Sequence, residues 1–265
     1  MITCIQLKHS DTIKQLRDDY FRTLVAPMDG MWEKTMIAPS IFWELRDQEQ
    51  YVGYFCLGTH QELLRFHLRK SSLDRAQEIF QWMISTNGIQ QAMTSTIEPM
   101  YFSLCLDLQR TITLHSYLFR DNQPRELSSG LSNSLFRKAE KSELADLVRF
   151  YQANIEEPGE WIEPFLTAHL SREELFVLYN QHTLVAVGEC ISSQSQPPFA
   201  DLGMVVARLY RGRGVGSFLL TQLKHHCYEV GWKPICSCEA SNRASKKAIE
   251  NAGFISEHRL VKITF

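Results

Sequence analysis

Three glycines spaced two residues apart stand between a strand-like apolar run and an amphipathic helix, and this junction constrains the fold more than any other feature. Gly212, Gly214 and Gly216 follow the run Met204–Val206, and residues 217–230 carry apolar side chains at helical spacing. Glycine has no Cβ, so a bulky anionic group can approach the backbone closely. Unpaired N–H groups and the helix dipole attract negative charge at the start of the helix. The junction therefore predicts an α/β fold with an anion cradle between strand and helix.

Two other nucleotide-binding motifs resemble this junction and are excluded by its surroundings. Gly212, Gly214 and Ser217 nearly match the dinucleotide fingerprint, and Glu239 follows the next strand where a ribose-binding acid would stand. A dinucleotide fold needs several further strand–helix units, and too few residues remain after Glu239 to form them. A P-loop needs Gly-Lys followed by Ser or Thr, which this junction lacks.

The composition is that of a soluble globular protein, and it limits the partners that the chain attracts. Hydrophobic residues make up 44% and charged residues 22% of the 265 residues, and the formal net charge is −2. A chain with this charge has no overall attraction for nucleic acid or anionic lipid, so any anion must bind locally. No apolar run approaches the ~18 residues that cross a membrane. The start of the chain alternates like a strand and lacks the features of a signal peptide. We therefore expect no nucleic-acid partner and no membrane.

The seven cysteines are scattered without the spacing of a disulfide framework. An odd number of dispersed cysteines favours reduced thiols, and therefore a cytoplasmic protein. Cys236 and Cys238 stand two apart in an expected strand, so they face the same side of it. No second cysteine pair and no histidine lies at the spacing of metal ligands. We therefore expect Cys236 and Cys238 to be buried thiols and not part of a metal site.

The chain is long enough for two domains, and a polar segment near its middle separates them. Residues 121–130 are rich in turn formers and form the best linker candidate. We expect an N-terminal domain over residues 1–125 and a C-terminal domain over residues 133–265.

Both halves show the same order of elements towards their ends: strand, strand, helix, strand, helix, strand. In the first half we expect strands over residues 51–57, 62–68, 92–97 and 111–119, and helices over 73–85 and 100–108. In the second half we expect strands over residues 135–139, 175–179, 183–192, 201–206, 234–238 and 255–265, and helices over 142–152, 161–170, 217–230 and 244–251. The two sequences hardly match, so the shared order indicates a duplicated fold.

Two motifs of the second half, in this order and on these elements, resemble those of the GNAT superfamily of N-acetyltransferases. Arg211-x-x-Gly214-x-Gly216 is similar to the loop that binds the coenzyme A diphosphate in that family. Asn242-x-x-Ser245, followed by Gly253-Phe254, is similar to the family's next motif. The resemblance spans residues 135–265, and it covers only the element order in the first half. Residues 69–74 occupy the position of the cradle there and contain no glycine, so we expect a degenerate first domain without a cofactor.

The resemblance implies two tandem GNAT-like domains with mixed sheets, the second of which binds acetyl-CoA. In the family, the strand before the loop splays from its neighbour, and its exposed N–H groups hold the pantetheine arm and polarise the thioester carbonyl. The expected cofactor-binding residues are Met204, Val205, Val206, Arg211, Gly212, Arg213, Gly214, Val215, Gly216, Ser217, Asn242 and Ser245. Arg211 and Arg213 would add charge-assisted contacts to the phosphates.

An alkylamine is mostly protonated at neutral pH, so acetyl transfer to it needs a base. Glu189, on the expected strand before the splayed one, and Asp201, at the start of the splayed strand, are the candidates. The alternatives are a solvated strand residue for Glu189 and a turn residue for Asp201. Many family members carry a tyrosine seven residues after the motif asparagine as the acid for departing coenzyme A, and here that position is Ile249.

The function that we predict is acetyl transfer from acetyl-CoA to a primary amine of a small molecule by direct attack. The alternatives are a non-catalytic acyl-CoA-binding sensor or partner protein, which Ile249 permits, and a protein or peptide N-acetyltransferase. The first half would cover the acceptor site, complete a sheet or mediate homodimer formation. The second half ends one strand short of the family pattern, so another segment has to finish its sheet.

Overall fold

The computed structural model describes residues 1–7, 14–122 and 134–265. The chain forms two compact units, of which the first comprises Met1–Tyr117 with His258–Phe265 and the second comprises Leu118–Glu257. Most of the predicted linker, residues 121–130, lies outside the described residues. No helix within the described ranges is long and apolar enough to span a membrane.

The first half of the chain folds into a mixed sheet with helices on both faces. Its elements are β1 (Ile2–Gln6), α1 (Lys14–Thr23), α2 (Gly30–Trp32), η2 (Glu33–Ile37), β2 (Ile41–Asp47), β3 (Gln50–Leu57), β4 (Leu63–Leu68), η3 (Lys70–Arg75), α3 (Ala76–Thr86), β5 (Gln91–Ser95), α4 (Pro99–Leu108) and β6 (Thr111–Asp121). Strands β1 to β4 are antiparallel neighbours, and β4 pairs with β5 in parallel.

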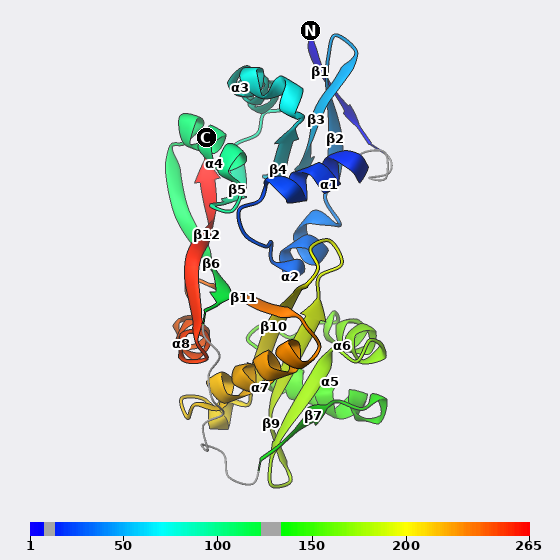
Figure 1. Cartoon of the computed structure of the whole chain (residues 1–265), viewed down its shortest axis with the longest axis vertical. Helices are drawn as coiled ribbons and strands as arrows, with labels where there is room; N and C mark the ends of the chain where they lie inside the picture. The colour runs from blue at the N-terminus through cyan, green and yellow to red at the C-terminus, as the bar shows by residue number, and fades with distance from the viewer. Residues whose placement is uncertain (8–13, 123–133) are drawn as a thin grey trace. The chain divides into compact units, whose positions relative to one another are not determined.

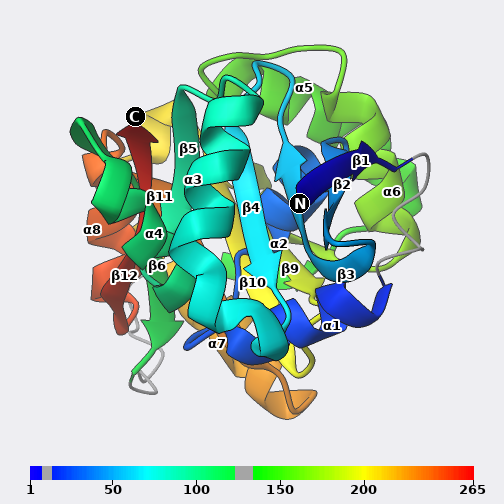
Figure 2. The same cartoon turned by 90° about the horizontal axis from the view of Figure 1, so that it is seen from above.

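Strand β4 shows why helices cover both faces of this sheet. Side chains alternate between the faces of a strand, so neighbouring residues of β4 meet different helices. The ring of Phe66 lies 5.0 Å from that of Phe80 on α3, and Figure 2 shows α3 crossing the sheet beside β4. Arg65 and His67 instead contact Tyr20 on α1. The face of β4 that carries Arg65 and His67 therefore meets α1, and the opposite face packs into an apolar core under α3.

The second half of the chain repeats this architecture. Its elements are β7 (Ser134–Lys138), η4 (Lys141–Glu143), α5 (Leu144–Asn154), α6 (Ile162–Ser171), β8 (Leu175–Asn180), β9 (Thr183–Ser192), β10 (Phe199–Val206), η5 (Arg208–Tyr210), α7 (Val215–Glu229), β11 (Lys233–Glu239), α8 (Arg243–Asn251) and β12 (Phe254–Thr264). Strands β7 to β10 are antiparallel neighbours, and β10 pairs with β11 in parallel. These elements match the predicted ranges closely, because each carries a clear periodic apolar pattern.

Helices of the second unit cover opposite faces of its sheet. A Cβ at Gly188 of β9 would meet Leu219 and Leu223 of α7, whereas the next residue, Glu189, contacts Tyr151 of α5. Helix α6 packs beside α5, and Figure 1 shows α7 crossing the sheet over β9 and β10. The glycine-bearing junction before α7 and the carboxylate of Glu189 therefore belong to different faces.

Strands β6 and β12 depart from the predicted domain boundaries at residues 125 and 133. The strand order β5-β12-β6-β11 places each of them next to a strand of the other half of the sequence. Residues 258–264 of β12 belong to the first unit, where they pair with β5, and residues 118–121 of β6 belong to the second. The strand that the second half lacks is therefore supplied by β6. A local apolar pattern identifies a strand but not its sheet, which is why sequence alone gave contiguous domains.

Candidate active site

Strands β10 and β11 separate within the second unit. They pair only over Phe199–Asp201 and residues 233–235, whereas β10 continues to pair with β9 as far as Val206. Beyond Asp201, one edge of β10 therefore has no partner strand among the described residues. An unpaired edge presents backbone N–H and C=O groups to whatever lies in the opening.

The alternation of β10 identifies which backbone groups face the opening. The N–H of Ala207 donates to the carbonyl of Val185 on β9 at 2.9 Å. Because N–H groups alternate sides along a strand, Val205 also directs its N–H towards β9, and Met204 and Val206 direct theirs to the unpaired edge. Two of the three predicted backbone donors are therefore available to a ligand, and Val205 is committed to the sheet.

The cradle forms at the start of α7, where glycines turn the chain. Gly212 has φ +72° and Gly214 has φ +80°, in the left-handed region that favours glycine. The first hydrogen bond of α7 runs from the N–H of Phe218 to the carbonyl of Gly214 at 3.0 Å. In the part of the chain that the structure describes, the N–H groups of Val215, Gly216 and Ser217 have no acceptor. Three donors and the helix dipole therefore meet at one point.

Gly216 allows close packing between strand and helices. A Cβ at this position would lie 3.0 Å from the Met204 sulfur and 3.4 Å from the Ala248 Cβ on α8. The absence of a side chain lets the start of α7 approach both β10 and α8. The cradle is therefore held between the splayed strand and the last helix.

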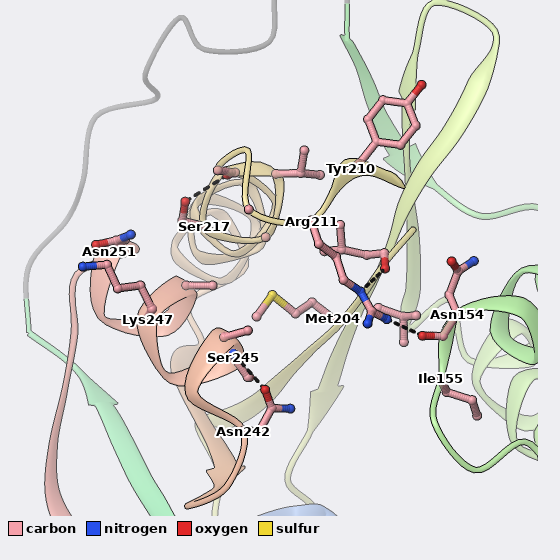
Figure 3. A pocket seen from close by; sticks show the side chains of 18 of the residues that line it. Asn154, Ile155, Met204, Tyr210, Arg211, Ser217, Asn242, Ser245, Lys247 and Asn251 are labelled. Atoms are coloured by element: carbon pink, nitrogen blue, oxygen red, sulfur yellow. Dashed lines mark hydrogen bonds between the residues drawn. The ribbon is translucent and has the colours of Figure 1, made fainter. Parts of the chain in front are cut away.

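A cavity of about 670 Å³ lies along these elements. Figure 3 shows side chains that line it. Its lining residues are Asn154, Ile155, Glu156, Met204, Val205, Val206, Tyr210, Arg211, Gly212, Gly214, Val215, Gly216, Ser217, Glu239, Asn242, Ala244, Ser245, Lys247, Ala248 and Asn251. The volume is in the range of ligand sites, which is about 300–1,000 Å³. All of the predicted cofactor-binding residues except Arg213 line this cavity.

The two arginines of the junction have other partners. The Nε of Arg211 donates to the carbonyl of Val206 at 3.2 Å, and its Nη2 donates to the carbonyl of Asn154 at the end of α5. The guanidinium of Arg213 lies 5.8 Å from the ring centre of Tyr210. Arg211 therefore joins β10 to α5. Contacts of Arg211 and Arg213 with the phosphates stay a prediction, and the present geometry of the two side chains does not favour them.

Helix α8 begins with the second motif. Oδ1 of Asn242 accepts from the N–H of Ser245 at 3.0 Å, so the asparagine caps the helix. Both residues line the cavity. The hydroxyl of Ser217 donates to the carbonyl of Gly214 at 2.9 Å and thereby leaves its own N–H directed at the cradle.

Glu189 lies across from Gly203 in the β9–β10 ladder, on the α5 face of the sheet. The hydroxyl of Tyr151 donates to its Oε1 at 2.6 Å. A Cβ at Gly203 would stand 2.4 Å from its Oε2, so the glycine leaves room for the carboxylate above the strand. Burial raises the pKa of Glu189, and the hydrogen bond from Tyr151 opposes that rise. A carboxyl group with a raised pKa takes up a proton more readily than an exposed one, which suits a base. Glu189 itself does not line the cavity.

The other candidate residues lie at less favourable places. Asp201 is buried inside β10, paired in register with Ile191 and Ile235, and it does not line the cavity. Cys238, which was predicted only as a buried thiol, is buried, and burial raises the pKa of that thiol to about 11. Ile249 is buried on α8 and carries no acidic group. Within the described ranges, no three His, Cys, Asp or Glu side chains gather into a metal site.

Sequence reasoning did not identify Tyr151 as a partner of Glu189. Tyr151 is a buried member of the apolar face of α5, and Glu189 is an acid in an otherwise apolar strand. Buried hydroxyl and carboxyl groups need partners. This requirement indicates from the sequence that Tyr151 and Glu189 each need a hydrogen-bond partner. It does not identify the partner.

The first unit has a different structure where the cradle stands in the second. The turn η3 (Lys70–Arg75) follows β4 directly, and Arg69 at its start has an extended backbone. Residues 69–75, which all lie in the described part of the chain, have no positive φ angles of the kind seen at Gly212 and Gly214. The predicted absence of a cofactor there stays a prediction.

Comparisons with known proteins agree with the architecture of both halves. The chain matches the family model described as acetyltransferase (GNAT) domain over residues 9–122, and that described as acetyltransferase (GNAT) family over residues 141–254. A comparison with curated proteins found no match.

Solved structures resemble the whole chain. An acetyltransferase of the GNAT family from Colwellia psychrerythraea is 31% identical, with a TM-score of 0.93 and 99% of each chain covered. A GCN5-related N-acetyltransferase from Sphaerobacter thermophilus is 12% identical, with a TM-score of 0.68 over 100% of this chain and 95% of that chain. A tandem GNAT protein from the clavulanic acid biosynthesis pathway is 12% identical, with a TM-score of 0.62 over 100% and 98%. The predicted α/β tandem fold is confirmed.

Proposed function

We propose that this chain, which belongs to the GNAT acetyltransferase family, transfers the acetyl group of acetyl-CoA to a primary amine of a small molecule. Membership follows from the relative that is 31% identical over 99% of both chains. The family carries out acetyl transfer from acetyl-CoA, and the small-molecule amine is our proposal for the acceptor.

The observation that carries the proposal is the opening between β10 and β11 with the cradle at its end. Val215, Gly216 and Ser217 offer N–H groups to a diphosphate, and Met204 and Val206 offer theirs to the pantetheine arm. A Cβ at Gly216 would crowd the space that these elements share. The residues present therefore fit acetyl-CoA, which supplies an acetyl group activated as a thioester.

The chain's own groups support proton removal and charge stabilisation. The carboxylate of Glu189 would accept a proton from the acceptor's ammonium group, directly or through a water molecule. The N–H of Met204 or Val206 would donate to the oxygen on which negative charge develops during attack. Both groups belong to adjacent strands, so the rigid sheet fixes their separation.

One observation favours a second function, an acyl-CoA sensor without turnover. Ile249 is buried where many family members carry the tyrosine acid, so no side chain at this position can protonate the departing thiolate of coenzyme A. A thiol of pKa about 8–9 leaves tolerably as a thiolate, so this loss is compatible with catalysis. Turnover must therefore be measured separately from binding.

Calorimetric titration with acetyl-CoA tests the cradle, with two glycine variants as a matched pair. Gly214 and Gly231 stand at opposite ends of α7, have φ angles of +80° and +79°, and face open space. Glutamate at either position suffers the same backbone strain, but only Gly214→Glu places a negative charge in the cradle. We expect one site per chain, abolished or weakened about 100-fold by Gly214→Glu and retained in Gly231→Glu. Equal affinity for the two variants would contradict the cradle.

An assay of thiol release with a panel of small primary amines tests the acceptor. Release of coenzyme A with at least one amine, and formation of its amide, supports the proposal. Stoichiometric binding of acetyl-CoA without turnover on any amine would favour the sensor instead.

A further inference from the structure

Lys247 is a cation of the cavity for which the described residues provide no ion-pair or hydrogen-bond partner. Its neighbour Lys246 forms an ion pair of 2.5 Å with Glu250, one turn further along α8. Lys247 is exposed, lines the cavity, and has no ion pair or hydrogen bond to any residue in the described part of the chain. An ammonium group in this position is available to an anionic ligand.

One face of α8 brings Lys247 to the cradle. Ala244, Lys247, Ala248 and Asn251 follow the i, i+3, i+4, i+7 spacing of a single helix face, and all four line the cavity. Ala248 sits where a Cβ on Gly216 would lie 3.4 Å away, so this face meets the start of α7. Figure 3 shows Lys247 and Asn251 beside Ser217, at the end of the cavity away from Arg211 and Asn154.

The other charged side chains of the cavity lining are not placed to bind an anionic ligand. Arg211 donates to two backbone carbonyls. Glu156 and Glu239 are acids and would repel a phosphate at their positions. Of the two cations in the lining, Arg211 and Lys247, it is therefore Lys247 whose charge no described residue neutralises.

We propose that Lys247 binds the ribose 3′-phosphate of acetyl-CoA and so distinguishes it from its 3′-dephospho form. This inference rests on the proposed function. The diphosphate is accounted for by the N–H groups of Val215, Gly216 and Ser217. The remaining phosphate of the molecule is on the ribose, at the nucleotide end. Lys247 lies at the end of the cavity away from the unpaired edge of β10 that would hold the pantetheine arm.

The test compares two ligands with three forms of the full-length protein. Acetyl-CoA and 3′-dephospho-acetyl-CoA are titrated into the wild type, Lys247→Met and Lys246→Met. Methionine keeps much of the aliphatic length of lysine and removes only the charge. We expect Lys247→Met to weaken acetyl-CoA binding about 3- to 10-fold, in the range between an exposed ion pair and a charge-assisted hydrogen bond. Its affinity for the dephospho ligand should stay that of the wild type.

Lys246→Met is the control, because its partner is Glu250 and it does not line the cavity. It should bind both ligands like the wild type. The preference of the wild type for acetyl-CoA should also shrink at high salt, because the contact is exposed.

Each other outcome has a distinct meaning. An equal loss for both ligands in Lys247→Met would overturn the 3′-phosphate assignment. Unchanged affinities, or the same loss in Lys246→Met, would overturn the role of Lys247. A wild type that binds neither ligand would contradict the proposed function itself, which separates that failure from a failure of this inference.

Discussion

The hydroxyl of Tyr151 on α5 lies 2.6 Å from Oε1 of Glu189 on β9 and donates a hydrogen bond to it. Burial raises the pKa of this carboxyl group, and the bond from Tyr151 holds the rise in check. The same bond fixes one carboxylate oxygen, while Oε2 lies above Gly203. Tyr151 is therefore a positioning residue for the base that we propose.

Glu189→Gln should remove the base and keep the cofactor site. The amide has nearly the size of the carboxylate and can still accept from Tyr151, so the fold should be kept. We expect kcat with an amine acceptor to fall about 10²- to 10⁴-fold, the usual contribution of a general base. Acetyl-CoA affinity, measured by calorimetry, should not change. A variant with normal kcat and an unchanged pH profile would exclude Glu189 as the base.

Tyr151→Phe should change the pH dependence of the reaction. Without the hydrogen bond, the pKa of Glu189 rises further, because burial is then unopposed. The carboxyl group stays protonated to higher pH, so the acidic limb of kcat/KM should move to higher pH. Activity on the alkaline side should be retained to a larger extent than in Glu189→Gln. Loss of activity by the same factor at every pH would instead indicate a merely structural role.

Gly203→Ala should displace the carboxylate without touching the cradle. The new Cβ would lie 2.4 Å from Oε2 and 3.2 Å from Cβ of Glu189, so that side chain must move. A displaced base costs catalysis steeply, and we expect kcat to fall about 10- to 100-fold. In a Gly203→Ala/Glu189→Gln double variant the alanine should add little, since both changes act on one group. If the losses of kcat in the two single variants added up in the double variant, Gly203 would act on catalysis independently of Glu189.

The site could be predicted from sequence where its chemistry is carried by backbone. Glycines at Gly212 and Gly214 indicate the turn, and the periodicity of residues 217–230 indicates the helix that it precedes. The resemblance then identified the splayed strand. Side-chain partners could not be predicted in the same way, since Arg211 could equally point at a phosphate or at a carbonyl. The structure places it on the carbonyls of Val206 and Asn154.

The individual helices and strands could be predicted from the sequence. The assignment of parts of β6 and β12 to the unit of the other half could not. Residues 111–119 were expected as a strand, and β6 is one. Its final residues lie in the second unit, where Asp121 pairs with the buried Lys224 of α7 at 2.6 Å. A lysine at an inward position of an amphipathic helix was the only local sign of such a partner.

Asp121→Asn should destabilise the second unit through Lys224. The lysine side chain is 1% exposed, and it also donates to the carbonyl of Ala252 at 3.0 Å. Removing the carboxylate breaks this buried ion pair, and breaking such a pair from one side costs about 3–5 kcal/mol. Urea unfolding should report this loss of unfolding free energy. The double variant Asp121→Asn/Lys224→Met should recover part of it, and the absence of any recovery would contradict the ion-pair account.

Glu98 and His67, both buried in the first unit, should make opposite contributions to the pH dependence of stability. Burial raises the pKa of Glu98 to about 7, although Tyr20 and the N–H of Ser95 donate to it and Arg65 lies nearby. The native state therefore keeps a proton that the unfolded state loses, so this contribution is full below pH ~4.5 and is lost as pH rises to ~7. Burial lowers the pKa of His67 to about 4. Its contribution is therefore gained as pH rises from ~4 to ~6.5.

In the wild type these two slopes should largely cancel between pH ~4.5 and ~6.5. Glu98→Gln keeps partners for Tyr20 and Ser95, since its amide can donate to the Tyr20 oxygen and its carbonyl can accept from the Ser95 N–H. With only His67 titrating, the unfolding free energy should rise with pH, by up to about 3 kcal/mol. His67→Gln should give the reverse, a fall towards pH ~7. Urea unfolding of the full-length chain at half-unit pH steps measures both slopes, and parallel curves for the two variants would refute the assignment.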